Sequence, residues 1–124
     1  MFDRRARWWL VLLLMGWPYL VCADPVVLGI GAMRCQDFLE TERVAGRGEV
    51  SAVARRIRYR SWLAGFASGL SLASGEDVLR GVPLEGVLRQ LRYRCEKHPG
   101  RAIAEAATGL LAGISRLPPL MERD

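Results

Sequence analysis

The residue types that are typical of disulfide-rich scaffolds and of zinc sites are scarce in this chain of 124 residues. It has three Cys and one His, too few for a disulfide-dense scaffold or a zinc shell. No internal repeat occurs, and alternating β-branched residues are nearly absent after residue 35, which argues against a sheet. Apolar residues make up 51% of the chain and charged residues 25%, a balance that disfavours intrinsic disorder. The composition therefore predicts one small helical domain without a metal or cofactor.

The one long apolar run lies at the N-terminus, and we expect it to be removed. Residues 1–7 carry three Arg against one Asp, residues 8–16 are unbroken apolar sequence, and small residues follow. This is the layout of a secretory signal peptide, with cleavage expected after Ala23. The alternative is a retained membrane anchor, but residues 8–23 fall short of the roughly 20 apolar residues that a bilayer needs. We therefore expect an exported protein with no stable membrane span after cleavage.

Export determines how the cysteines are interpreted. Cleavage would remove Cys22 and leave Cys35 and Cys95, an even pair in an oxidising compartment, so one disulfide is expected. Such a bridge closes a loop of about 60 residues and stabilises by roughly 4 kcal/mol in the chain-entropy model. The alternatives are two free buried thiols or a metal site.

Apolar spacing predicts four helices. The first is expected over residues 36–45, where acidic residues in the first turns suit a helix N-terminus. The second covers residues 49–74, the third begins at Pro83 and ends near Cys95, and the fourth covers residues 101–114. The inward row of the third helix ends at Cys95, so the disulfide would tie that end to the start of the first helix.

The long segment 49–74 has two apolar faces. Val50, Val53 and Ile57 share one face. A second set lies nearly opposite and consists of Tyr59, Trp62, Leu63, Phe66 and Leu70. A helix buried on one side cannot satisfy both sets, so either the chain bends near residues 60–61 or a continuous helix has partners on both sides, which we prefer. The helix-weakening Gly65 and Gly69 indicate that something packs against them.

Candidate catalytic chemistry is thin. His98 stands alone at a predicted helix end, where a capping role is commoner than general-base catalysis. The chain has no G-x-S-x-G sequence, and no carboxylate pair is framed by an apolar cleft. The basic run at residues 55–60 spreads too widely around a helix to track phosphates, and an exported chain rarely meets nucleic acid. We expect neither an enzyme nor a nucleic-acid-binding protein. A polar pocket formed by His98 with Glu96 or Arg101 would instead favour an enzyme.

Three segments resemble the HdeA/HdeB family of small periplasmic acid-stress proteins. They are residues 33–39 (MRCQDFL), 62–69 (WLAGFASG) and 93–99 (YRCEKHP). The positions that carry the resemblance are Cys35, Asp37, Phe38, Trp62, Gly65, Phe66, Gly69, Cys95, His98 and Pro99. His98 stands where the family usually has Asn, and the long Arg-rich helix also departs from its pattern.

The resemblance implies an all-α fold, and the expected architecture is a small four-helix orthogonal bundle with a Cys35–Cys95 bridge. It also implies a periplasmic location and a homodimer that loosens in acid. On this basis the chain divides into a signal peptide (residues 1–23), an extended lead-in (24–34), an HdeA/HdeB-like helical domain (35–115) and a flexible tail (116–124).

The function implied by the resemblance is that of an acid-stress chaperone, or holdase. Such a protein exposes apolar surface at low pH and binds unfolded periplasmic proteins. The residues expected to contact clients are Tyr59, Trp62, Phe66 and Leu70. The alternative is a non-enzymatic periplasmic module that binds one specific protein partner, such as a toxin-immunity or inhibitor protein.

Overall fold

The computed structural model describes residues 25–118, which form one short 3₁₀ helix and four α-helices. The elements in chain order are η1 (Gly29–Ala32), α2 (Cys35–Ala45), α3 (Val50–Ser74), α4 (Leu84–Lys97) and α5 (Ile103–Ser115). Within this part of the chain there is no strand, and one isolated bridge joins Arg34 to Ala102. The expected all-α four-helix fold is confirmed. The predicted signal peptide and residues 119–124 of the predicted tail lie outside the described residues.

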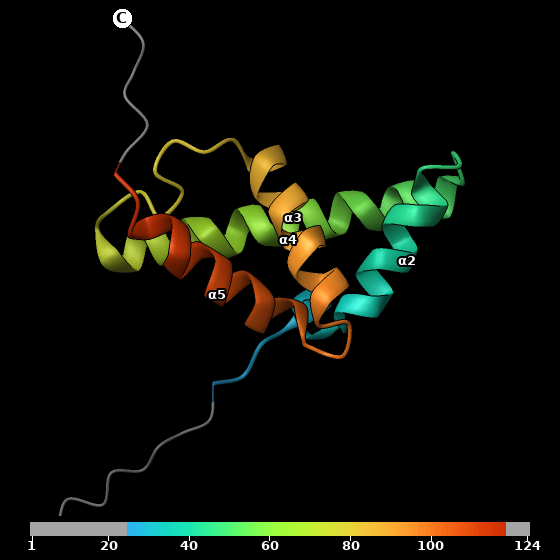
Figure 1. The fold of residues 1–124 in the computed structure, drawn as a ribbon, viewed down its shortest axis with the longest axis horizontal. Coiled ribbons are helices and arrows are strands. Elements are labelled where there is room, and N and C mark those ends of the chain that lie inside the picture. The colour runs from blue at the N-terminus through green and yellow to red at the C-terminus, as the bar shows by residue number, and fades with distance from the viewer. Residues whose placement is uncertain (1–24, 119–124) are drawn as a thin grey trace, which may run out of the picture.

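The long helix α3 forms the axis of the bundle (Figure 1). In this view α3 runs horizontally, α4 crosses in front of it, and α2 and α5 lie toward its two ends. α2 packs against both α3 and α4, while α5 packs against α4 and η1. No helix within residues 25–118 combines the length and the apolar content needed to cross a bilayer.

The helix ends follow the local signals closely. At the start of α2, the carboxylate Oδ2 of Asp37 accepts a hydrogen bond from the backbone N–H of Arg34 at 3.2 Å, as an acidic residue in a first turn commonly does. α3 ends at Gly75, whose φ of +74° is a left-handed conformation that favours glycine. Pro83 directly precedes α4. The predicted helices therefore agree with the observed ones to within two residues at each end.

Residues 75–83 connect α3 to α4 and are held by one carboxylate. Asp77 accepts hydrogen bonds from the backbone N–H of Leu79 at 2.9 Å and of Gly81 at 3.0 Å. Ser71 in α3 accepts a third from the backbone N–H of Val78 at 3.2 Å, and the Val78 side chain is buried against the core. The connection thus closes one end of the core.

The core is built where the inward face of α3 meets α2, α4 and α5. Its largest fully buried side chains are Phe38, Tyr59, Leu63, Val87, Leu91, Ile103, Leu110 and Leu111. Burial of an apolar side chain of this size contributes about 1.5–3 kcal/mol. The Phe38 and Tyr59 rings meet edge to face, with centroids 5.0 Å apart, and join α2 to α3.

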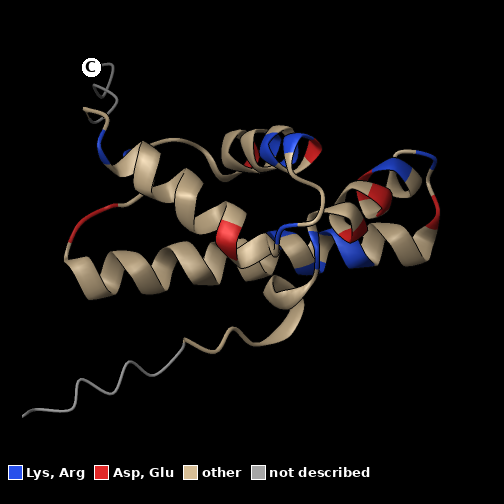
Figure 2. Ribbon diagram, turned by 60° about the horizontal axis from the view of Figure 1, so that its bottom comes forward, with Lys and Arg blue, Asp and Glu red and all other residues tan. Residues whose placement is uncertain are grey.

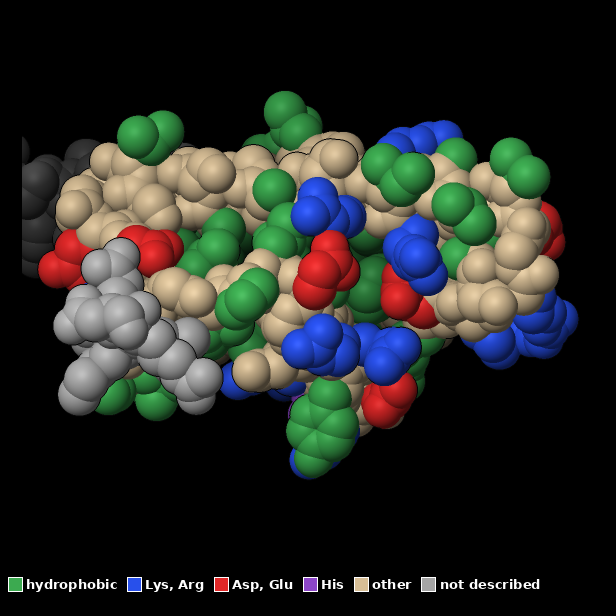
Figure 3. Space-filling model, turned by 90° about the horizontal axis from the view of Figure 1, so that it is seen from above, with side chains coloured by type: hydrophobic (Ala, Val, Ile, Leu, Met, Phe, Trp, Pro, Cys, Tyr) green, Lys and Arg blue, Asp and Glu red, His purple; other side chains and the backbone are tan. Residues whose placement is uncertain are grey.

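The outward apolar face of α3, which carries Val50 and Ile57, is largely exposed within residues 25–118. α3 is one continuous helix of 25 residues, as preferred, yet only the Tyr59 side is packed. Val50 and Ile57 are 82% and 57% exposed, and a Cβ added to Gly65 or Gly69 would meet nothing within 4 Å. The prediction that something packs against these glycines is therefore wrong for this part of the chain. Figure 3 shows hydrophobic side chains protruding singly along the upper edge, which α3 forms.

Candidate functional site

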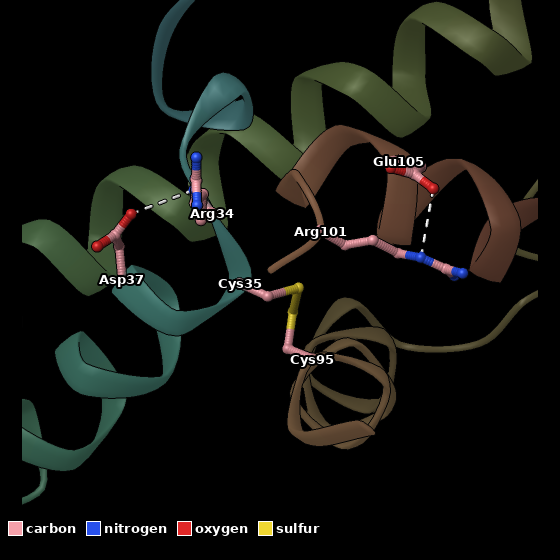
Figure 4. Close-up of a disulfide and its surroundings, with 6 residues drawn as sticks. All are labelled: Arg34, Cys35, Asp37, Cys95, Arg101 and Glu105. Atoms are coloured by element: carbon pink, nitrogen blue, oxygen red, sulfur yellow. Dashed lines mark hydrogen bonds and ion pairs between the residues drawn. A yellow bond between two sulfur atoms is a disulfide. The ribbon is translucent and has the colours of Figure 1, made fainter. Parts of the chain in front are cut away.

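The disulfide and two backbone hydrogen bonds join the start of α2 to the end of α4 and the connection that follows it. Cys35 begins α2 and Cys95 lies near the end of α4; their Cα atoms are 4.9 Å apart, both side chains are buried, and the sulfurs are bonded as predicted (Figure 4). The backbone N–H of Cys35 donates to the carbonyl of Arg101 at 2.8 Å, and that of Gln36 donates to Pro99 at 2.9 Å. The bridge and these bonds hold the connection between α4 and α5 against the start of α2.

Three half-buried apolar residues of α3 form a strip beside the core, which we call the aromatic strip: Trp62, Phe66 and Leu70. The Trp62 and Phe66 rings are stacked, with centroids 4.9 Å apart and an interplanar angle of 12°. η1 lies directly on the indole, because a Cβ on Gly31 would overlap the Trp62 ring. The predicted lead-in is thus not extended throughout; its 3₁₀ turn covers part of the strip.

Of the four residues expected to contact clients, three lie in the aromatic strip and the fourth lies inside the bundle. Tyr59 is 2% exposed, and its hydroxyl has no hydrogen-bond partner within residues 25–118. Burial raises the pKa of Tyr59 above its usual value, and the negative charge of Asp37 adds to this shift. Tyr59 therefore supports the core in this form of the protein, and only the strip lies near the surface.

A hollow of about 580 Å³ lies between α4 and α5, and we call it the basic hollow. Its lining residues are Arg89, Gln90, Tyr93, Arg94, Lys97, His98, Arg101, Glu105, Ala106 and Gly109. The enzyme alternative required a polar pocket around His98 with Glu96 or Arg101. His98 and Arg101 do line this hollow, whereas Glu96 does not. Sequence reasoning missed Arg89, Arg94 and Lys97 of α4, which line the hollow together with His98 and Arg101.

His98 ends α4, as predicted. Its backbone N–H donates to the carbonyl of Arg94 at 3.1 Å, and His98 is one of the residues that line the basic hollow. No Ser, Thr or Cys lines the hollow beside it. The hollow can therefore hold an anion with these cationic groups.

The basic run at residues 55–60 does not converge on one point. Arg60 forms an ion pair with Glu85 at 2.6 Å and so links α3 to α4. Arg55 and Arg58 instead line a separate depression of about 700 Å³ next to Tyr59. The C-terminal half of α3 carries no charged residue (Figure 2), so the charge of α3 is confined to its N-terminal half.

No group of three or more His, Cys, Asp or Glu side chains gathers in a metal-binding arrangement within residues 25–118. Both cysteines of this region are engaged in the disulfide.

On the surface of α2, Arg43 Nε donates to Glu40 at 2.9 Å, and this hydrogen bond lowers the pKa of Glu40.

Comparison with known proteins adds no assignment. No protein-family model matches the chain, and no curated protein or solved structure matches it either.

Proposed function

We propose that this chain is a non-enzymatic, periplasmic holdase that binds unfolded proteins in acid. The resemblance to the HdeA/HdeB family suggests this class of activity. The observation that carries the proposal is the aromatic strip: Trp62 and Phe66 are stacked on one face of α3, and the 3₁₀ turn of η1 lies on the Trp62 indole. Apolar surface held beneath so small an element can be uncovered without dismantling the bundle.

Carboxylates hold several contacts around the bundle that acid would weaken. Asp77 fixes residues 75–83, Asp37 accepts from the residue before α2, and Glu85 pairs with Arg60 between α3 and α4. Protonation removes the charge that strengthens each of these bonds. The lowered pKa of Glu40 acts in the same direction, because a carboxyl with a depressed folded-state pKa contributes stability at neutral pH that is lost as the pH falls through that value.

The change in charge favours opening as well. Loss of residues 1–23 removes three Arg and one Asp, which leaves 15 basic and 12 acidic side chains and a net charge of +3. Protonation of the 12 carboxylates and of His98 raises the net charge to +16. Self-repulsion of this size destabilises a compact state. The disulfide does not titrate in acid, so α2 and α4 stay joined while their surroundings loosen.

The test is suppression of client aggregation by the purified oxidised protein. Light scattering of an acid-denatured client is followed at pH 3 and at pH 7, and we expect suppression at pH 3 only. Phe66→Ser should weaken it, since it removes half of the stacked pair. Leu72→Ser is the matched control, because Leu72 is on the same helix but 86% exposed. Absence of suppression at pH 3, or equal suppression at both pH values, would contradict the proposal.

A second candidate is a module that binds one specific protein partner at neutral pH. The outward face of α3 favours it, because the apolar side chains of Val50, Ile57 and Leu72 are exposed there. An exposed apolar helix face suits packing against a helix of another protein. Ile57→Glu should then abolish a stoichiometric complex at neutral pH while leaving acid suppression of aggregation intact. Retention of the complex by this variant would eliminate the outward face as the docking site.

A further inference from the structure

The basic hollow has an unbalanced charge. Four cations line it, namely Arg89, Arg94, Lys97 and Arg101, against the single carboxylate of Glu105. That carboxylate is already engaged, because Arg101 Nε lies 3.3 Å from Glu105 Oε1 (Figure 4). Within residues 25–118 the three cations on α4 have no carboxylate within ion-pair distance. The hollow therefore presents a net charge of +3 before His98 is counted.

Two glycines of α5 make room for the guanidinium of Arg94. A Cβ on Gly109 would be 3.5 Å from Arg94 Nη1, and one on Gly113 would be 3.7 Å from Arg94 Nη2. The guanidinium thus rests against α5 at two positions that lack side chains. An Arg placed in this way, without an acidic partner, keeps its donors free for an outside ligand. Its planar, forked donors match the oxygens of a phosphate group.

The other walls of the hollow are also ordered. The Lys97 ammonium lies 4.5 Å from the centre of the Tyr93 ring, a cation–π contact that limits its motion. The backbone of Arg101 is fixed by the hydrogen bond from Cys35, and the neighbouring disulfide anchors the end of α4. The cations are therefore gathered before any ligand arrives, which lowers the entropy cost of binding.

The geometry points to a binding site for a phosphate-bearing anion in this hollow. The volume of about 580 Å³ lies within the range of small-molecule sites and fits a phosphate with an attached glycerol or sugar. The cations converge in one concavity instead of following a line, which favours a single phosphate group over an extended polyanion. Two sources share this chemistry: the headgroup of an anionic phospholipid and a soluble phosphate ester. The site is separate from the aromatic strip and does not depend on the proposed holdase activity.

The experiment measures binding of the purified oxidised protein at pH 7. One arm uses flotation with vesicles of phosphatidylcholine, alone or mixed with phosphatidylglycerol or with oleate, and the other uses calorimetric titration with glycerol phosphate. Binding only to phosphatidylglycerol vesicles identifies a lipid, and binding of glycerol phosphate identifies a soluble ester. Equal binding to oleate vesicles would overturn the proposal, because oleate is anionic but has no phosphate. Binding in neither arm would overturn it too.

Substitutions locate the site. Arg94→Gln and Lys97→Gln should each weaken binding by about tenfold, as expected for the loss of one charge-assisted hydrogen bond. Arg92→Gln removes the same charge from an exposed position of α4 outside the hollow and should have a much smaller effect. All three side chains are exposed, so helicity and melting temperature should be unchanged. Equal weakening by all three variants would mean general attraction of a basic protein to anions and would overturn the site.

Discussion

Gly31 has no room for a side chain. Any side chain there would overlap the Trp62 indole, so Gly31→Ala requires η1 or the ring to move. Overpacking of this kind costs about 1–3 kcal/mol. We expect the variant to have a lower free energy of unfolding in urea and a more accessible Trp62. Gly100→Ala is the control, because a Cβ there meets nothing within 4 Å. Equal stability of Gly31→Ala and wild type would contradict the packing of η1 on the strip.

The burial of Tyr59 should make the stability of the protein depend on pH in the alkaline range. Burial raises the folded-state pKa of this tyrosine, so the unfolded chain loses the phenol proton first, and stability falls as the pH rises above about 10, the usual tyrosine value. Because its hydroxyl has no partner within the described chain, Tyr59→Phe should change stability at pH 7 by no more than about 1 kcal/mol and reduce the alkaline loss. Thermal melts between pH 8 and 11 would check this, with Tyr93→Phe at an exposed position as control. An undiminished alkaline loss in Tyr59→Phe would contradict the assignment.

At the scale of the helices, two glycines within α3 lower its stability. Gly65 and Gly69 face open space in helical conformation, and each costs about 1 kcal/mol relative to Ala. Gly65→Ala and Gly69→Ala should therefore each raise the melting temperature. A drop in melting temperature would instead indicate that the outward face of α3 is covered in solution, in agreement with the second candidate function.

Helix positions could be predicted because apolar spacing and glycine or proline at the ends act locally. The third predicted helix, with apolar residues every three or four positions up to Cys95, is an example. Which of the two apolar faces of α3 is buried could not be predicted, because this depends on where the other helices pack against α3. The cover formed by η1 was also missed, since residues 24–33 have no period. The basic hollow was missed because single cations on α4 resemble a solvated face until α5 is placed beside them.

At the scale of the whole molecule, the disulfide is the main constraint on stability. The bonded cysteines are separated by 60 residues, and a closure of that length contributes roughly 4 kcal/mol in the chain-entropy model. We expect reductant, or the double substitution Cys35→Ser with Cys95→Ser, to lower the melting temperature strongly at pH 7. Wild-type protein that melts at the same temperature with and without reductant, and whose thiols can be alkylated without prior reduction, would contradict the bridged bundle.

The most direct test of acid opening uses Trp62 as a reporter. The other three tryptophans, Trp8, Trp9 and Trp17, precede the expected cleavage site, so Trp62 is the only one in the mature chain. The measurement is its emission and its quenching by acrylamide in the oxidised protein at pH 7 and pH 3. We expect a shift to longer wavelength and stronger quenching at pH 3 while helicity largely persists. Unchanged emission and quenching at the two pH values would contradict it.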